Sequence, residues 1–156
     1  FGQLHLRRAG WQTDRASLVC FHQVPNSGQI FAPVLPLLAT DRLALAIDTP
    51  GYGMSDPAPD PQTITAYADA IADGLAALDL GAIDLVGYHT GAAIAAELAK
   101  RLASRVRRIM LIAVPVFTPE ERARFGALPP IPWDEAGDWA REEWQRSWTW
   151  RGPGQT

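Results

Sequence analysis

The sequence predicts an α/β protein, in which helices cover both faces of a mainly parallel sheet. Short apolar runs of strand length alternate with segments of helical periodicity, which is the pattern of strand–helix–strand units. In addition, residues 43–47 are apolar throughout, as expected of a strand covered on both faces. With 156 residues, 47% of them apolar, the chain is long enough to bury a core.

Five segments have the pattern of strands, and they span residues 3–8, 17–21, 43–47, 83–86 and 106–114. The three middle strands end in loops at residues 22–28, 48–56 and 87–91. Chemistry in parallel sheets is placed in loops at the carboxyl ends of the strands. Candidate functional residues are therefore sought in these three loops.

Helices are expected at residues 63–78 and 91–102. In the first, Thr63 can cap the amino end, and apolar residues recur at three- and four-residue steps. The second is rich in alanine and apolar on nearly every face, so we expect it to be mostly buried. A third helix is predicted over residues 29–38, with apolar side chains on one side, namely Ile30, Val34 and Leu37 or Leu38.

The residues after Val114 have a different character. A helix with an acidic first turn is predicted to start at residues 118–121, and a proline-rich break follows at 126–132. Five of the six tryptophans then fall between residues 133 and 150, and one helical face can hold Trp139, Trp144 and Trp148. This face either packs against a helical partner or belongs to a lid over an apolar pocket.

Composition excludes several classes of function. Fourteen basic and 17 acidic residues give a net charge of −3 without a basic patch, so neither a nucleic acid nor a membrane is an expected partner. The single cysteine, Cys20, rules out an internal disulfide and a thiolate-clustered metal site. We expect a small-molecule substrate, no metal or cofactor, and a cytoplasmic location; a signal peptide before Phe1 would leave no trace here.

The segment Gly87-Tyr88-His89-Thr90-Gly91 joins a short strand to a buried helix. Glycine at both ends allows a sharp turn whose central side chain stands above the sheet edge, the geometry called a nucleophile elbow, with pattern G-x-S-x-G. Two other loops, His22-Gln23-Val24-Pro25 and residues 48–55, follow neighbouring strands.

Together, these three segments resemble the α/β-hydrolase family, which carries H-G-x-P, D-x-P-G-x-G-x-S and G-x-S-x-G in this order. The resemblance covers residues 3–117 and implies the core of that fold over 1–117. Residues 118–156 resemble the start of its helical cap. It implies a hydrolase that forms an acyl-enzyme with a nucleophile, an acid and a histidine base.

The sequence departs from the family pattern at the site itself. His89 stands where the family has Ser, Cys or Asp, and it is the last histidine in the chain, whereas the family's histidine follows its nucleophile. The chain is therefore interpreted as an amino-terminal fragment of the fold, incomplete at the carboxyl end. An open sheet edge then predicts poor solubility. Gln23 replaces the family's Gly, which changes how the loop can approach a ligand.

His89 is the candidate catalytic residue. Its imidazole can act as a general base near neutral pH or be transiently acylated. The resemblance assigns an oxyanion site to the backbone N–H groups of Val24 and Thr90. Alternatively, the elbow is kept for packing and His89 is inert.

The other candidates have supporting roles. His22 is expected to brace the oxyanion loop, and Asp48, Ser55 and Tyr88 to shape the loops around the pocket. Ser55 as a substitute nucleophile and Cys20 as a reactive thiol are disfavoured, and His5 suggests no role.

The first hypothesis is hydrolysis of an ester, amide or C–C bond in a small, partly apolar substrate. The alternative is a non-catalytic protein of the same fold that binds a ligand or a partner. A dinucleotide-binding domain is disfavoured because no glycine fingerprint opens a helix. The oligomeric state is left open.

Overall fold

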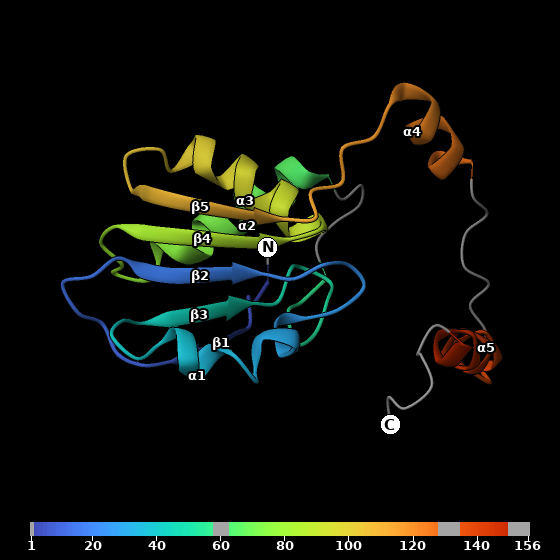
Figure 1. The fold of residues 1–156 in the computed structure, drawn as a ribbon, viewed down its shortest axis with the longest axis horizontal. Coiled ribbons are helices and arrows are strands. Elements are labelled where there is room, and N and C mark those ends of the chain that lie inside the picture. Colours follow the sequence, from blue (N-terminus) through green and yellow to red (C-terminus); the bar gives the residue numbers. More distant parts are fainter. Residues whose placement is uncertain (1, 58–62, 128–134, 150–156) are drawn as a thin grey trace. The chain divides into compact units, whose positions relative to one another are not determined.

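The structure is a computed structural model that describes residues 2–57, 63–127 and 135–149 (Figure 1). The chain divides into two compact units, residues 1–116 and 117–156. The second unit contains α4 (Pro119–Gly126) and α5 (Asp138–Thr149). Trp139 and Trp144 lie on α5, whereas Trp133 and Trp150 are outside the described residues. The assignment of this unit to a helical cap stays a prediction.

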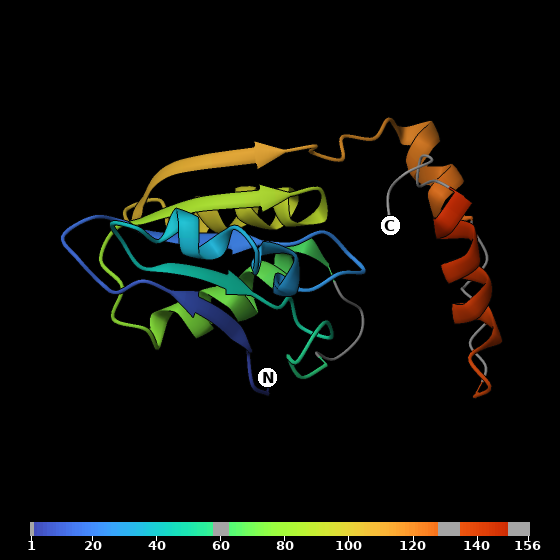
Figure 2. The same ribbon diagram turned by 60° about the horizontal axis from the view of Figure 1, so that its bottom comes forward.

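The first unit is built on a five-stranded sheet with the strand order β1-β3-β2-β4-β5. Its strands are β1 (Leu6–Ala9), β2 (Ser17–Phe21), β3 (Ala44–Ile47), β4 (Ile83–Tyr88) and β5 (Val106–Ile112). Strands β2 to β5 are parallel, and β1 pairs antiparallel with β3 at one edge (Figure 2). The predicted mainly parallel sheet is confirmed.

The carboxyl ends of the three central strands are level with one another. Phe21, the last residue of β2, is paired with Ile47 of β3 on one side and with Gly87 of β4 on the other. The loops that follow these strands therefore start from one row across the sheet, and neighbouring strands are about 4.8 Å apart.

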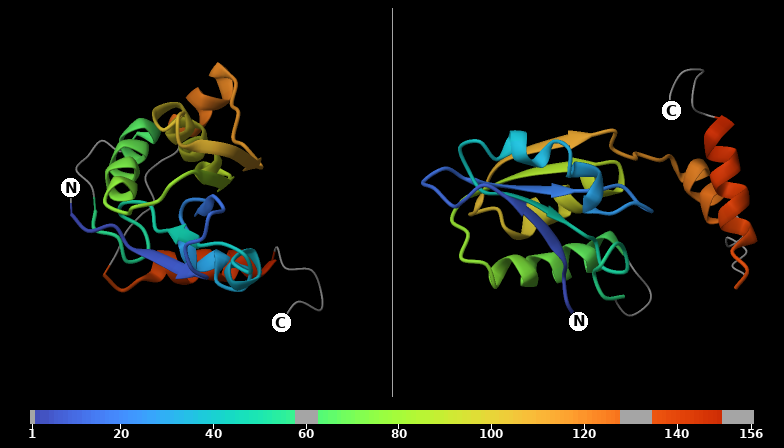
Figure 3. Two further views of the ribbon diagram at one scale, coloured as in Figure 1. Left: turned by 90° about the vertical axis from the view of Figure 1, so that its left-hand side faces the viewer. Right: turned by 90° about the horizontal axis from the view of Figure 1, so that it is seen from below.

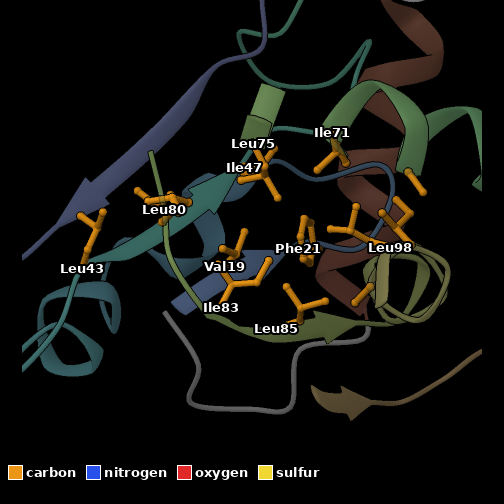
Figure 4. Packing of buried hydrophobic residues seen from close by; sticks show 14 residues of the cluster. Val19, Phe21, Leu43, Ile47, Ile71, Leu75, Leu80, Ile83, Leu85 and Leu98 are labelled. Carbon is orange, nitrogen blue, oxygen red and sulfur yellow. The ribbon is translucent and has the colours of Figure 1, made fainter. Parts of the chain in front are cut away.

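Helices cover both faces of the sheet, as predicted (Figure 3). On one face, α2 (Ile64–Ala76) and α3 (Thr90–Arg101) pack on every second strand residue, including Val19 and Phe21 (Figure 4). The intervening residues Leu18 and Cys20 point to the other face, which a shorter helical segment covers. This alternation follows from the two-residue period of a strand.

The ends of α2 and α3 agree with the sequence. The Thr63 side chain accepts a hydrogen bond from the Ala66 N–H at 3.0 Å, which caps the amino end of α2. Helix α3 buries Gly91, Ala92, Ile94, Ala95 and Leu98. None of the helices in the described part of the chain is long and apolar enough to span a membrane.

The helix predicted over residues 29–38 is instead two short pieces, the 3₁₀ helix η1 (Gly28–Phe31) and α1 (Leu35–Leu38). Pro33 lies between them and cannot donate a helical hydrogen bond, which explains the break. The predicted apolar side was wrong: Val34 and Leu37 are exposed, and the residues packed on the sheet are Phe31, Leu35 and Ala39.

Strand β5 is the open edge of the sheet in the first unit. All its apolar side chains except Val106 are exposed, with Met110 at 59% and Ile112 at 42%. The strand pairs with β4 on its other side. An exposed apolar edge of this kind is prone to pair with other chains, which fits the predicted poor solubility without testing it.

Helix α3 approaches the end of β2 at a point where no side chain can be accommodated. A Cβ atom on Gly91 would lie 2.2 Å from the carbonyl oxygen of Phe21 and 2.6 Å from that of His22. A Cβ on Gly87 would lie 2.4 Å from the Gly91 oxygen. The two glycines thus let the strand, the turn and the helix pack backbone to backbone.

We expect Gly91→Ala to lower the free energy of unfolding by about 2 kcal/mol or more, because a methyl group would push α3 away from β2. Gly81→Ala is the matched control, since nothing lies within 4 Å of a Cβ at that position. Denaturant unfolding of both variants measures the difference. Equal stabilities would contradict the close packing.

Candidate active site

His89 occupies a strained backbone position between β4 and α3. Its φ of 51° and ψ of −115° are unusual for a residue with a side chain. Its N–H donates to the Ile112 carbonyl at 2.9 Å, and its own carbonyl accepts from the Ala92 N–H at 2.9 Å. A strained, non-glycine residue at the apex of a strand-to-helix turn has the geometry expected of an elbow.

The His89 side chain is exposed at the carboxyl edge of the sheet. Its Nδ1 lies 3.3 Å from the Thr90 Oγ1, so the two neighbouring side chains are in contact. No carboxylate among the described residues bonds to this ring. Tyr88, the last residue of β4, is half-buried and pairs with Ile112 of β5.

The loop after β2 is fixed by the fully buried His22 ring. Its Nδ1 bonds to the Gln23 carbonyl oxygen at 2.9 Å, and its Nε2 accepts a hydrogen bond from the Thr49 N–H at 2.9 Å. Because a carbonyl only accepts and an N–H only donates, these partners assign the neutral tautomer with the proton on Nδ1. Val24, the predicted oxyanion residue, is the residue after Gln23 in this loop.

Asp48 connects three segments of the site. Each oxygen of its fully buried carboxylate accepts two hydrogen bonds. One oxygen accepts from the Gly28 N–H at 2.6 Å and from Arg7 at 2.9 Å. The other accepts from the Met54 N–H at 3.0 Å and pairs with His5 Nδ1 at 2.8 Å. Asp48 therefore ties both loops to the edge strand β1.

The pKa values of His22 and Asp48 are both lowered, but for different reasons. Desolvation is the main cause that lowers the pKa of His22, and it outweighs the hydrogen bond to Gln23 and the attraction of Asp48. Desolvation alone would raise the pKa of Asp48, but the bonds from Met54 and Gly28, with His5 and Arg7, outweigh it and lower that pKa.

Two disfavoured nucleophiles are held in structural positions. The Ser55 hydroxyl donates to the Asp48 carbonyl at 2.7 Å and accepts from the His5 N–H at 2.9 Å, so it is engaged within the loop. Cys20 is fully buried, and burial raises the pKa of its thiol to about 12. A thiol of this kind is not reactive near neutral pH.

The predicted site residues come from three adjacent strand ends. Val24 and Thr90 each lie three residues beyond the register pair Phe21–Gly87, so both follow from one level of the sheet. Asp48 directly follows Ile47, the partner of Phe21 on β3. The roles of Val24 and Thr90 as oxyanion donors stay a prediction.

Sequence reasoning assigned no role to His5, although the structure pairs it with Asp48. Arg7 was also missed, and its guanidinium bonds to the same carboxylate. The only available signal was the position of both residues on a segment that the antiparallel pairing of β1 places beside the end of β3. The pattern of apolar residues in one segment predicts a strand but not which other strand pairs with it.

The fold and the strained turn at His89 define an α/β protein whose candidate site lies at the carboxyl edge of a parallel sheet. Residues 16–141 match the family of the alpha/beta hydrolase fold, and the chain belongs to this family. The family resemblance predicted from the three loop motifs is thus confirmed.

Several relatives are hydrolases. A 2-(acetamidomethylene)succinate hydrolase of Mesorhizobium japonicum is 29% identical over 102 residues, which are 65% of this chain and 36% of that protein. The structure of the N-acyl homoserine lactonase AidH with N-butanoyl homoserine aligns with a TM-score of 0.68 and 28% identity, over 79% of this chain and 45% of that one. The haloalkane dehalogenase DatA of Agrobacterium tumefaciens aligns with a TM-score of 0.66 and 27% identity, over 80% and 45%. The chain spans less than half the length of these relatives.

We expect Asp48→Asn to destabilise the protein by about 3 kcal/mol, because an amide nitrogen cannot accept two of the four hydrogen bonds and Arg7 loses its buried counter-charge. Asp56→Asn is the control, since its exposed carboxylate accepts one hydrogen bond from the described residues, that of the Gln3 N–H. Thermal and denaturant unfolding compare the two variants. A loss at Asp56 as large as that at Asp48 would contradict the central role of Asp48.

We expect stability to fall as the pH drops below about 6.5, the ordinary pKa of histidine. The lowered pKa of His22 means that the unfolded chain takes up a proton first, so this contribution is present above that pH and is lost below it. Unfolding between pH 7.5 and 5.5 measures the slope for the wild type and His22→Asn. The variant should be less stable at pH 7.5 but show a flatter slope, and parallel slopes would exclude His22 as the cause.

Proposed function

We propose that this chain contributes to a hydrolase that cleaves an ester, amide or C–C bond in a small, partly apolar substrate, with His89 as the general base. The observation that carries the proposal is the exposed imidazole of His89 at the strained apex of the elbow. Strain of about 1–3 kcal/mol at a residue of this kind is characteristic of functional sites.

The proposed chemistry uses water as the nucleophile. Neutral His89 accepts a proton from water as the water oxygen attacks the substrate carbonyl, and the protonated ring returns that proton to the leaving group. The Thr90 N–H at the start of α3 and the Val24 N–H stabilise the oxyanion that forms between these steps. Covalent acylation of His89, followed by hydrolysis of the acyl-imidazole, is the second route to the same products.

The names of the relatives favour acyl-type substrates. A lactonase acting on N-acyl homoserine lactones and an acetamidomethylene-succinate hydrolase are both among the similar proteins. Both names describe small substrates with an amide group. An ester, lactone or amide of low molecular weight is therefore the substrate class to test first.

A binding protein without catalysis is the second candidate. It is favoured by one observation, that no described carboxylate orients the His89 ring as the acid of a triad would. Such a protein would bind an apolar ligand at the same edge of the sheet without turnover.

A panel of short-chain aryl esters and lactones, given to the complete polypeptide that the gene encodes, tests the proposal. We expect His89→Ala to reduce turnover about 10²–10⁴-fold, the contribution typical of a general base. Thr13→Ala is the control and should retain full activity, because Thr13 is half-buried in the segment that leads into the amino end of β2, whereas His89 lies at the carboxyl end of the sheet.

Two outcomes would contradict the proposal. Turnover that is equal in the wild type and His89→Ala would remove His89 from catalysis. Labelling of a serine by a fluorophosphonate probe would show that another residue is the nucleophile. Ligand binding without any turnover would favour the second candidate.

A further inference from the structure

Gln23 places a side chain at a position where the family pattern has none. In H-G-x-P the residue after histidine is glycine, whereas this chain has Gln23. An added amide next to the oxyanion loop can supply a hydrogen-bond donor that the backbone alone does not.

The register of the sheet brings the start of the Gln23 loop next to the carboxyl end of β4. Phe21 of β2 is paired with Gly87 of β4, and Gln23 and His89 each lie two residues further along their chains. The backbone at Gly91 also packs against the carbonyl oxygens of Phe21 and His22, immediately before Gln23. The start of α3 and the oxyanion loop are therefore in direct contact at this point.

The main chain of Gln23 is held firmly. Its carbonyl oxygen accepts hydrogen bonds from the His22 ring at 2.9 Å and from the Asn26 N–H at 2.9 Å. The His22 ring is itself fixed by the Thr49 N–H. A donor on this residue starts from a preorganised position, as catalysis by hydrogen bonding requires.

The side-chain amide has one buried end and one accessible end. Its Oε1 is buried and has no hydrogen-bond partner among the described residues, whereas its Nε2 is not among the buried unpartnered atoms. Because no described residue bonds to the side chain of Gln23, its NH₂ group is the end that solvent or a ligand can reach.

We propose that the Nε2–H of Gln23 is a further catalytic group, which donates a hydrogen bond to the oxyanion that develops on the substrate carbonyl next to His89. The proposal rests on the proposed function and adds a side-chain donor to the two backbone N–H groups. Asparagine and glutamine side chains are established donors of this type in other enzymes.

Two substitutions at Gln23 test whether the group acts as a donor. Gln23→Met keeps the length of the side chain and removes the amide, and Gln23→Glu keeps the shape but leaves only acceptor oxygens. We expect both to lower kcat about 10²–10³-fold with little change in KM, because the bond forms mainly in the transition state. Gln12→Met is the matched control, since Gln12 is exposed and, among the described residues, its side chain bonds only to the Asp79 carbonyl.

Binding of an aryl alkylphosphonate, a stable anion that imitates the tetrahedral intermediate, provides a readout that does not depend on turnover. Both Gln23 variants should bind it at least tenfold more weakly than the wild type, and Gln23→Glu most weakly because its charge repels the anion. Thermal melting of the two variants checks that they fold.

The possible results separate the two proposals. Loss of kcat and of phosphonate binding in both variants supports the donor role. Retained activity in Gln23→Glu identifies an acceptor and overturns it, as does unchanged activity in Gln23→Met. If the wild type turns over no ester, the proposed function fails, and unchanged phosphonate binding in the variants then overturns the role of Gln23 as well.

Discussion

The close approach of α3 to the carboxyl end of β2 is the constraint on which the candidate site depends. The backbone atoms around Gly91 and Gly87 leave no room for a Cβ, so the turn between them must be sharp. Because the turn is sharp, its central residue, His89, adopts a positive φ, and its side chain is directed out over the sheet edge. The strain at one residue is thus a consequence of backbone packing at two others.

A second layer holds the surrounding loops at the same level. Asp48 receives four hydrogen bonds from the edge strand and from both loops, and buried His22 joins the loop after β2 to the loop after β3. These interactions need an ionised carboxylate and a neutral imidazole, which is what the lowered pKa values of both groups provide. The loops are therefore positioned by charge and tautomer as much as by packing.

The sequence was sufficient for the fold and for the sharp strand-to-helix turn at His89, because both depend on local patterns. Apolar runs located the strands, and two glycines at a strand–helix junction located His89. The register between strands was not accessible in this way. The pairing of His5 with Asp48 depends on β1 running antiparallel beside β3, a long-range relation that no local pattern encodes. The packed side of residues 29–38 was also not accessible from a local pattern. The prolines break this segment into two short helices, so Phe31 and Leu35 pack on the sheet instead of the side predicted from helical periodicity.

The two residues that depart from the family pattern are related through the sheet. His89 replaces the nucleophile and Gln23 replaces a glycine, and both lie two residues beyond the paired residues Phe21 and Gly87. In the proposed mechanism, His89 acts as a general base in place of a covalent nucleophile, so water, a weaker nucleophile, attacks and the oxyanion still has to be stabilised. In this mechanism, the neutral Gln23 amide beside the substrate carbonyl stabilises the charge of the oxyanion, so the His89 imidazole does not need to be a stronger base. Under the two proposals, the departures at His89 and Gln23 are chemically complementary, whereas a turn kept for packing alone would require no donor at residue 23.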